Sequence, residues 1–256
     1  MNLEYYVARN WSLKSLNLPG QLGEQLQLST RCRNTDFPIR ALRYWFVAHA
    51  IVEFANRAKQ QLSVNEIGIN AGEMRRFYNH HCQVEELTDR VVHWDGLDLD
   101  VSRAPRELYS SLTIHDLNND QPFPKVGYDV VVLLHVLEHL PNPEHAFSRV
   151  CETLAPGGIV IGGFPSTPHL LIRFWQNKIR KRASPSGHVS CFSRKRAEAL
   201  AHRAGLEICF MGCGFVLRHS GSLLENYQWW ARWNVLAGTL CKSFPTELVW
   251  CFRRPG

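Results

Sequence analysis

The stretch VNEIGINAGEMRRF, residues 64–77, decides the fold, because a strand pattern, a glycine turn and a helix pattern follow one another in it. Residues 64–67 are typical of a buried strand, and residues 72–82 are typical of a helix. Gly68 and Gly72 stand in the turn, where glycine lets the backbone adopt positive φ and approach a ligand. Such a turn often holds a nucleotide at a helix N-terminus, but plain strand–helix connections use it equally. It therefore predicts an α/β unit and a candidate cofactor loop.

Strand and helix patterns alternate along the rest of the chain. Residues 128–136, YDVVVLLHV, form an almost continuous apolar run, which is typical of a strand buried on both faces. The other expected strands are 91–99, 112–116, 159–164, 206–214 and 247–254, and the other expected helices are 39–60, 144–154 and 194–204. This alternation predicts a doubly wound α/β sheet, in which ligands sit beyond the carboxyl ends of the strands.

The composition is that of a globular protein with a sizeable core, since 45% of the 256 residues are hydrophobic and 20% are charged. None of the eight cysteines forms a CxxC pair, so we expect them to be reduced and mostly buried. The N-terminal segment MNLEYYVARNWSLKS is too polar for a signal peptide. No run reaches the roughly 18 apolar residues that a membrane span needs. We therefore expect a cytoplasmic protein.

Two acidic residues follow the second and third expected strands. Asp98 ends the second strand, where a carboxylate can accept both hydroxyls of a ribose. Asp116 ends the third strand, where a carboxylate can accept from an adenine amine. Either acid alone could be an ordinary turn residue. In order behind the glycine turn, the two acids outline a site for a nucleoside.

The chain resembles class I S-adenosylmethionine-dependent methyltransferases, and most of all the group of ubiquinone- and menaquinone-type and related small-molecule enzymes. The resemblance spans about residues 62–215, and its most specific part is DVVVLLHVLEHL followed by LAPGG; the other matching stretches are VNEIGINAG, GLDLD, HDLNNDQPFPKVGYD, IVIGGFPS and GHVSCFSRKRAEALAHRAGL. It implies a Rossmann-like, mostly parallel seven-stranded sheet with an antiparallel last strand. It also implies a biosynthetic transferase that uses S-adenosylmethionine and releases S-adenosylhomocysteine.

The resemblance also assigns cofactor-binding residues, position by position. The glycine loop would line the methionine and ribose end, Glu66 would support that loop and the methionine amine, and the acids would hold the ribose and the adenine. Leu99 and Leu117 would lie beside the adenine, and Leu134 and His135 would face the methionine and the methyl group. The implied cofactor residues are Glu66, Gly68, Asn70, Gly72, Asp98, Leu99, Asp116, Leu117, Leu134 and His135.

The sequence departs from the family pattern in two places. The loop has Asn70 and Ala71 where the family usually has a further glycine, but asparagine tolerates left-handed backbone conformations better than most residues. Asp98 also lies thirty residues after Gly68, whereas about 20 is usual in related nucleotide folds. The extra length falls in HHCQVEELTDR, which leaves Glu85 or Glu86 as an alternative ribose acid.

Candidate catalytic residues cluster in LLHVLEHLPNP and in the later loop SPSGHVSCFS. Methyl transfer from a sulfonium is an in-line displacement, so the protein must align the nucleophile and remove its proton where needed. His135, Glu138, His139 and His188 are the candidates for base or acceptor contact. Some look-alikes hold a divalent metal with two carboxylates and a histidine here. His135 replaces the first carboxylate and disfavours magnesium, so we expect no metal. Glu138 could equally have only a structural role in the turn between strand and helix, and His188 could be a surface histidine without a role in the site.

The acceptor is predicted from the segments outside the shared core. Residues 1–60 are expected to form a helical lid on a methyltransferase domain, 61–256, with insertions near 166–190 and 218–245. We expect an oxygen acceptor, less readily nitrogen, on a small molecule, a sugar or a lipid-linked compound. A peripheral membrane contact is a further option, and the oligomeric state stays open. Residues 171–203 carry nine basic side chains and one acid, which keeps an RNA methyltransferase as an alternative. The altered glycine loop keeps a catalytically inactive cofactor-binding protein as another.

Overall fold

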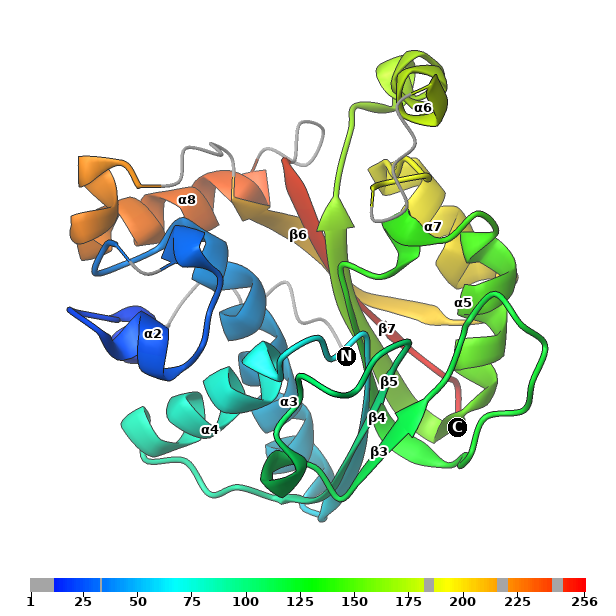
Figure 1. Cartoon of the computed structure of the whole chain (residues 1–256), viewed down its shortest axis with the longest axis horizontal. Helices are drawn as coiled ribbons and strands as arrows, with labels where there is room; N and C mark the ends of the chain where they lie inside the picture. The colour runs from blue at the N-terminus through cyan, green and yellow to red at the C-terminus, as the bar shows by residue number, and fades with distance from the viewer. Residues whose placement is uncertain (1–11, 33, 182–186, 216–220, 241–245) are drawn as a thin grey trace.

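A seven-stranded sheet forms the centre of the computed structural model, which describes residues 12–32, 34–181, 187–215, 221–240 and 246–256 (Figure 1). The strand order is β3-β2-β1-β4-β5-β7-β6. Within the described residues the strands run parallel, except that β7 is antiparallel to both β5 and β6. The strands are β1 (Leu62–Ile67), β2 (Val91–Asp98), β3 (Ser111–Ile114), β4 (Tyr128–Leu134), β5 (Leu154–Pro165), β6 (Glu207–Phe215) and β7 (Glu247–Arg253). The predicted Rossmann-like α/β fold is confirmed.

Helices cover both faces of the sheet (Figure 1). One face carries α3 (Leu42–Ala58), α4 (Glu73–Val84) and α8 (Gln228–Leu240), and the other carries α5 (Pro143–Glu152) and α7 (Arg194–Arg203). A further helix, α6 (Ile172–Lys181), follows β5. The short helices are α2 (Leu22–Gln25), η1 (Lys14–Leu16), η2 (Thr30–Cys32), η3 (Ile39–Ala41), η4 (Arg106–Leu108), η5 (Leu137–His139), η6 (His169–Leu171) and η7 (Leu223–Asn226).

The apolar run of β4 explains why the sheet can be covered on both sides. Val130 and Val132 join the core under α3 and α4, whereas Val131 and Leu133 join the core under α5 and α7. All four side chains are buried, because successive residues of a strand point to opposite faces. Strand β4 therefore stands at the centre of the molecule, and its carboxyl end opens between the two helical layers.

Some element boundaries differ from those that the sequence predicts. The helix expected over 144–154 ends at Glu152, and β5 begins at Leu154 rather than at Ile159. Leu154 pairs with Tyr128 of β4, so a partner far along the chain extends the strand through the APGG segment. The third strand ends at Ile114, which leaves Asp116 in the loop that follows it.

The described part of the N-terminal segment packs on α3, α4 and η7. Leu13, Leu16 and Leu28 are buried in the same core as α3. The buried carboxylate of Glu225 in η7 accepts from Thr35 Oγ1 and from the backbone nitrogen of Ile39, each at 3.2 Å. Residues far apart in the chain are thus joined near the carboxyl end of the sheet. Among the helices that the structure describes, none is long and apolar enough to cross a membrane.

Candidate cofactor and acceptor site

The carboxyl ends of β1, β2 and β4 lie side by side, because Ile67 pairs with Leu97 on one side and with Leu133 on the other. A pocket of about 300 Å³ lies at these ends. Five of the residues that the sequence points to line it, namely Glu66, Gly68, Asn70, Leu134 and His135. Ser29, Arg43 and Tyr44, from the N-terminal segment and α3, line it too, and the sequence analysis missed them.

The glycine loop has the backbone geometry of a close ligand approach. Gly68 and Gly72 have φ of 79° and 80°, and a side-chain carbon on Gly68 would lie 2.3 Å from Val136 Cγ2. Asn70 has φ of 48°, which is the left-handed conformation that asparagine tolerates. Its side chain donates from Nδ2 to Glu73 Oε1 at 2.8 Å and so caps the turn onto α4. The loop therefore keeps its shape without a central glycine.

Asp98 lies against this loop. Its Oδ2 accepts from the backbone nitrogen of Asn70 at 2.8 Å, and its Oδ1 accepts from that of Leu99 at 2.7 Å. The alternative acids, Glu85 and Glu86, follow the last residue of α4, whereas the glycine loop precedes its first residue. A 12-residue helix spans about 18 Å, so both alternatives lie far from the loop. The geometry favours Asp98 as the ribose-binding acid.

The side expected to hold the adenine is more open. Leu99 and Ile114 are 64% and 68% exposed, and Ile114 pairs with Asp98 across the two strands. Asp116 accepts from both nitrogens of Asn118, at 2.9 and 3.0 Å. The Leu117 side chain is buried in the core under α5. Ile114 was not among the expected site residues, because its exposure appears only once the strands are paired.

Glu66 is a buried carboxyl group at the floor of the pocket. Its Oε2 accepts from Trp94 Nε1 at 2.9 Å and from the Tyr109 hydroxyl at 3.2 Å. Burial raises the pKa of Glu66 to about 8, although both hydrogen bonds act in the opposite direction. The group can therefore exchange a proton near neutral pH, and a cationic ligand in the pocket would favour its charged form.

Replacing Glu66 with glutamine is expected to stabilise the protein at pH 8 and to leave its stability at pH 5 nearly unchanged. In the unfolded chain the carboxyl ionises near its ordinary pKa of 4.5, whereas the folded protein keeps the proton to about pH 8. Between these values the unfolded state binds fewer protons, so each rise of one pH unit costs the folded state up to about 1.4 kcal/mol. Glutamine has no proton to lose and still accepts from Trp94 and Tyr109. Thermal unfolding midpoints from pH 5 to 8 would test this.

The matched control for this experiment is Glu107→Gln, which changes an exposed carboxylate in η4. Its unfolding midpoint should follow the wild-type pH profile. If the Glu66→Gln and wild-type profiles ran parallel over the whole range, the raised pKa of Glu66 would be ruled out.

His135 lies between the pocket and the candidate catalytic residues. It has φ of 56°, which is unusual for a residue other than glycine and is found where the surroundings enforce it. Its Nδ1 lies 2.8 Å from Glu138 Oε1, and its Nε2 lies 3.2 Å from Glu247 Oε1. Glu247, at the start of β7, also forms a buried ion pair with Arg43 at 2.7 Å. Four side chains from three segments, the turn itself, α3 and β7, thus fix the turn after β4.

Charge within this network sets the protonation of His135. Burial alone lowers the pKa of His135, but the charge of Glu247 and the hydrogen bonds to both carboxylates outweigh it, so the pKa is raised. Burial raises the pKa of Glu247, but the charges of Arg43 and His135 outweigh burial and bring that pKa below its ordinary value. His135 is therefore held as a cation over a wider pH range than a free histidine. The sequence analysis missed Arg43 and Glu247. The local sequence hints at their burial only in that each charged residue stands beside apolar neighbours.

Glu138, His139 and His188 converge beyond the end of β4. Their ligand atoms all lie within 4.8 Å of one another, and the two imidazole rings meet edge to face at 5.1 Å. Glu138 is 1% exposed, and its Oε2 has no hydrogen-bond partner among the described residues. His139 Nδ1 lies 3.2 Å from the carbonyl of Gly187 and donates to it, so a neutral ring keeps its lone pair on Nε2. This group can accept a proton or hold a metal ion.

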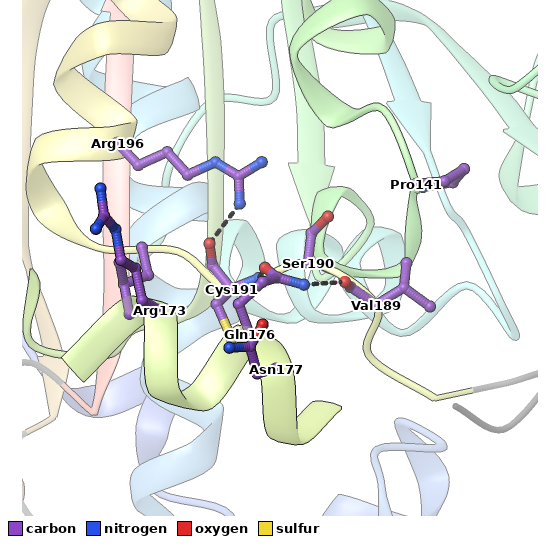
Figure 2. Close-up of a pocket in the computed structure, with 9 residues that line it drawn as sticks. Pro141, Arg173, Gln176, Asn177, Val189, Ser190, Cys191 and Arg196 are labelled. Carbon is purple, nitrogen blue, oxygen red and sulfur yellow. Dashed lines mark hydrogen bonds between the residues drawn. The ribbon is translucent and has the colours of Figure 1, made fainter. Parts of the chain in front are cut away.

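The residues that follow His188, Val189 to Cys191, lie against α6 (Figure 2). The backbone nitrogens of Val189 and Ser190 donate to the Glu138 carbonyl at 2.8 and 3.0 Å. Gln176 of α6 donates to the Val189 carbonyl and accepts from the backbone nitrogen of Cys191. An open pocket of about 670 Å³ separates α6 from Pro141, which follows Glu138 closely in the chain, and from Arg196 of α7. The position of the loop that carries His188 therefore depends on the placement of α6.

A family model described as "Methyltransferase domain" matches residues 39–209, two thirds of the chain. This range holds the cofactor pocket residues from Arg43 to His135 and the three converging side chains Glu138, His139 and His188. A comparison with curated proteins gave no match.

Solved structures with a similar fold include several methyltransferases. An S-adenosylmethionine-dependent methyltransferase from Mesorhizobium loti is 16% identical, with a TM-score of 0.56 over 84% of this chain and all of that one. A candidate sarcosine dimethylglycine methyltransferase from Galdieria sulphuraria is 14% identical, with a TM-score of 0.57 over 85% of each chain. A third match comes from the complex of the Haloferax volcanii Trm112 methyltransferase activator with a candidate methyltransferase. It is 17% identical, with a TM-score of 0.51 over 84% of this chain and 90% of that one. At these identities the likeness shows the fold.

Proposed function

The chain belongs to the methyltransferase-domain family and uses S-adenosylmethionine as its methyl donor, and from this premise we propose that it methylates an oxygen atom of a small-molecule, sugar or lipid-linked acceptor. The convergence of Glu138, His139 and His188 beside the cofactor pocket is the observation that carries the proposal. An alcohol or phenol must lose a proton during transfer, and this group offers proton acceptors at the place where the acceptor would enter.

The cofactor takes the pocket at the carboxyl ends of β1, β2 and β4. The methionine part lies between the glycine loop and His135, with Glu66 beneath it. Asp98 accepts from the ribose hydroxyls, and the adenine packs on the exposed side chains of Leu99 and Ile114. S-Adenosylmethionine supplies a methyl group on a positively charged sulfur, so the protein's own part is to bind, orient and exclude water.

Asn70 offers a specific test of this placement. Asn70→Gly is expected to bind S-adenosylhomocysteine nearly as well as wild type, because glycine adopts positive φ freely. Asn70→Val is expected to bind about tenfold more weakly, because a β-branched residue at positive φ costs on the order of 1–2 kcal/mol. Isothermal calorimetry on both variants would measure the difference. Equal affinity in the two variants would mean that this backbone geometry does not matter for binding.

Proton removal is the most direct role for the three converging side chains. His139 Nε2 is the base, because its Nδ1 is engaged with the Gly187 carbonyl. His188, whose ring meets that of His139, positions the acceptor oxygen. Glu138 holds His135 in place through its Oε1, and its Oε2, which has no partner among the described residues, faces the cluster as a further proton acceptor. His135 links the base to the cofactor pocket.

The same geometry favours a second mode, in which Glu138, His139 and His188 bind a divalent metal that polarises the acceptor oxygen. Two imidazoles and one carboxylate are the donor set of softer divalent ions such as Zn²⁺, Fe²⁺ or Co²⁺ rather than of Mg²⁺. The orphaned Oε2 of Glu138 fits a ligand at this position. Turnover that is lost with a chelator and restored by one of these ions would establish the metal mode, and turnover that resists chelation would establish the base.

The basic segment 171–203 gives less support to an RNA substrate than its charge suggests. Arg194 pairs with Glu198 at 3.0 Å, and Arg196 pairs with Glu144 at 2.8 Å. Arg196 also donates to the Cys191 carbonyl, so these guanidinium groups are used inside the fold. A groove for single-stranded RNA needs basic side chains beside stacking aromatic rings, and Arg194 and Arg196 are not available for it.

An acceptor screen tests the proposed function. The protein is incubated with methyl-labelled S-adenosylmethionine and separate panels of phenols, sugars, lipid-linked alcohols, amines and short RNAs. We expect saturable label transfer to at least one hydroxyl-bearing class, with one S-adenosylhomocysteine released for each methyl transferred. Transfer only to amines or only to RNA would overturn the oxygen assignment.

A further inference from the structure

Two helices at the carboxyl end of β5 place apolar side chains in solvent. Near α6, Leu170, Leu171 and Phe174 are 95%, 48% and 63% exposed. Near α8, Tyr227, Trp229 and Trp233 are 55%, 55% and 42% exposed. We call these six residues the apolar rim. A single exposed apolar residue needs no explanation, but clusters of this kind mark interaction surfaces.

Both parts of the rim stand at the same end of the sheet. Helix α6 follows β5, which ends at Pro165, and α8 precedes β7, which begins at Glu247. Pro165 and Glu247 are paired, and Gly163 pairs with Leu134 at the end of β4. The carboxyl end of β4, where His135 and Glu138 lie, is therefore at this same end. Figure 1 shows α6 and α8 on the two sides of the end to which β5 points.

The charge of the two helices is positive only. Residues 172–181 and 228–240 contain no aspartate or glutamate. Arg173 is exposed beside Phe174, and Arg232 is exposed between Trp229 and Trp233. Lys178 Nζ lies 4.6 Å from the centre of the Trp175 ring. Aromatic and aliphatic side chains mixed with arginine and lysine are the composition of helices that lie in the surface of an anionic membrane.

We propose that the apolar rim docks this protein on an anionic lipid bilayer, with α6 and α8 lying in the interface and the acceptor site facing the membrane. Apolar side chains enter the headgroup region, and Arg173, Lys178 and Arg232 meet lipid phosphates at the surface. The inference rests on the proposed function in one respect, since it selects a lipid-linked acceptor from the proposed classes.

Other occupants fit the rim less well. A second copy of this chain in a two-fold dimer would bring the same patch of each copy together, and so set two positively charged patches face to face. RNA bases would stack on Trp229 and Trp233, but the most exposed residue, Leu170, has no ring on which a base can stack. A bilayer accommodates aliphatic, aromatic and basic groups at once.

Vesicle flotation of the full chain tests the proposal, with vesicles of phosphatidylcholine alone and with added phosphatidylserine. The wild type should float with the anionic vesicles and much less with the neutral ones, and high salt should weaken its binding. Phe174→Glu and Trp229→Glu should each weaken vesicle binding about tenfold or more, because each puts an acid in place of a membrane-entering ring. The matched control is Val126→Glu. Val126 is 65% exposed and lies just before β4, at the end of that strand opposite to the apolar rim. This variant should bind vesicles as the wild type does.

S-Adenosylhomocysteine binding, measured on every variant, shows that each is folded and separates this proposal from the proposed function. Wild-type protein that binds the cofactor product but ignores anionic vesicles would overturn the docking and leave the methyltransferase site intact. A rim that instead drives a concentration-dependent dimer, lost in Phe174→Glu, would also overturn it, as would salt-sensitive binding of RNA that competes with vesicles. Flotation without label transfer to any hydroxyl-bearing acceptor would count only against the proposed function.

Discussion

Asp98→Ala is expected to weaken the binding of S-adenosylmethionine and S-adenosylhomocysteine about 100-fold. The carboxylate is placed to accept from both ribose hydroxyls, and two hydrogen bonds to a charged group contribute on the order of 3 kcal/mol together. The substitution also removes the acceptor for the backbone nitrogen of Asn70, which holds the glycine loop against β2. Calorimetric titration of the purified protein with both ligands measures the effect.

The chain offers a close control two residues further on. Asp100 is exposed and accepts from the backbone nitrogen of Ser102, and in the described part of the chain its side chain makes no hydrogen bond to the glycine loop. Asp100→Ala should therefore bind both ligands as wild type does. If Asp98→Ala kept wild-type affinity while the wild type bound at micromolar concentration, another acid would hold the ribose and the placement of the cofactor would be wrong.

His139→Ala is expected to lower kcat about 100-fold while leaving the affinity for S-adenosylmethionine unchanged. General-base removal costs roughly 10²–10⁴ in rate, and the imidazole lies outside the residues that line the cofactor pocket. His188→Ala should instead raise KM for the acceptor more than it lowers kcat, because His188 positions the acceptor rather than taking its proton. Steady-state kinetics on the acceptor found by screening would separate the two effects.

His202→Ala is the control, because it removes an exposed histidine from the last turn of α7, away from the cluster. Its kinetic constants should match those of the wild type. A loss of kcat in His139→Ala that exogenous imidazole restores would support the base directly. Equal kcat in His139→Ala and wild type would remove His139 from the chemistry and leave Glu138 as the nearest proton acceptor.

Several features of the fold follow from the sequence because they depend on near neighbours. The run VVVLL in β4 is buried on both faces, as its composition predicts, since alternate side chains of one strand must face opposite layers. Asn70 adopts positive φ, as expected of the residue that replaces a loop glycine. The order of strand-end residues also placed Asp98 beside the glycine loop, despite its unusual distance along the chain.

Other features could not be predicted from the sequence, because they depend on which segments meet. The side chain of Leu117, expected beside the adenine, is buried in the core under α5, and that of Ile114 is exposed beside Asp98. The strand after α5 begins five residues before the expected start, because Leu154 finds a partner in Tyr128. Neither result can be read from the residues of one segment alone.

The sequence by itself determined the strand–turn–helix unit at residues 64–77, the parallel α/β architecture and the acid at the end of β2, because these rest on backbone sterics and on the period of apolar residues. Only the tertiary structure decided that Arg43 pairs with Glu247, 204 positions away, and that His188 meets His139 across 49 positions. The physical reason is that a buried charge or a shared proton needs a partner within about 3 to 5 Å, and the order of strands in the sheet selects that partner.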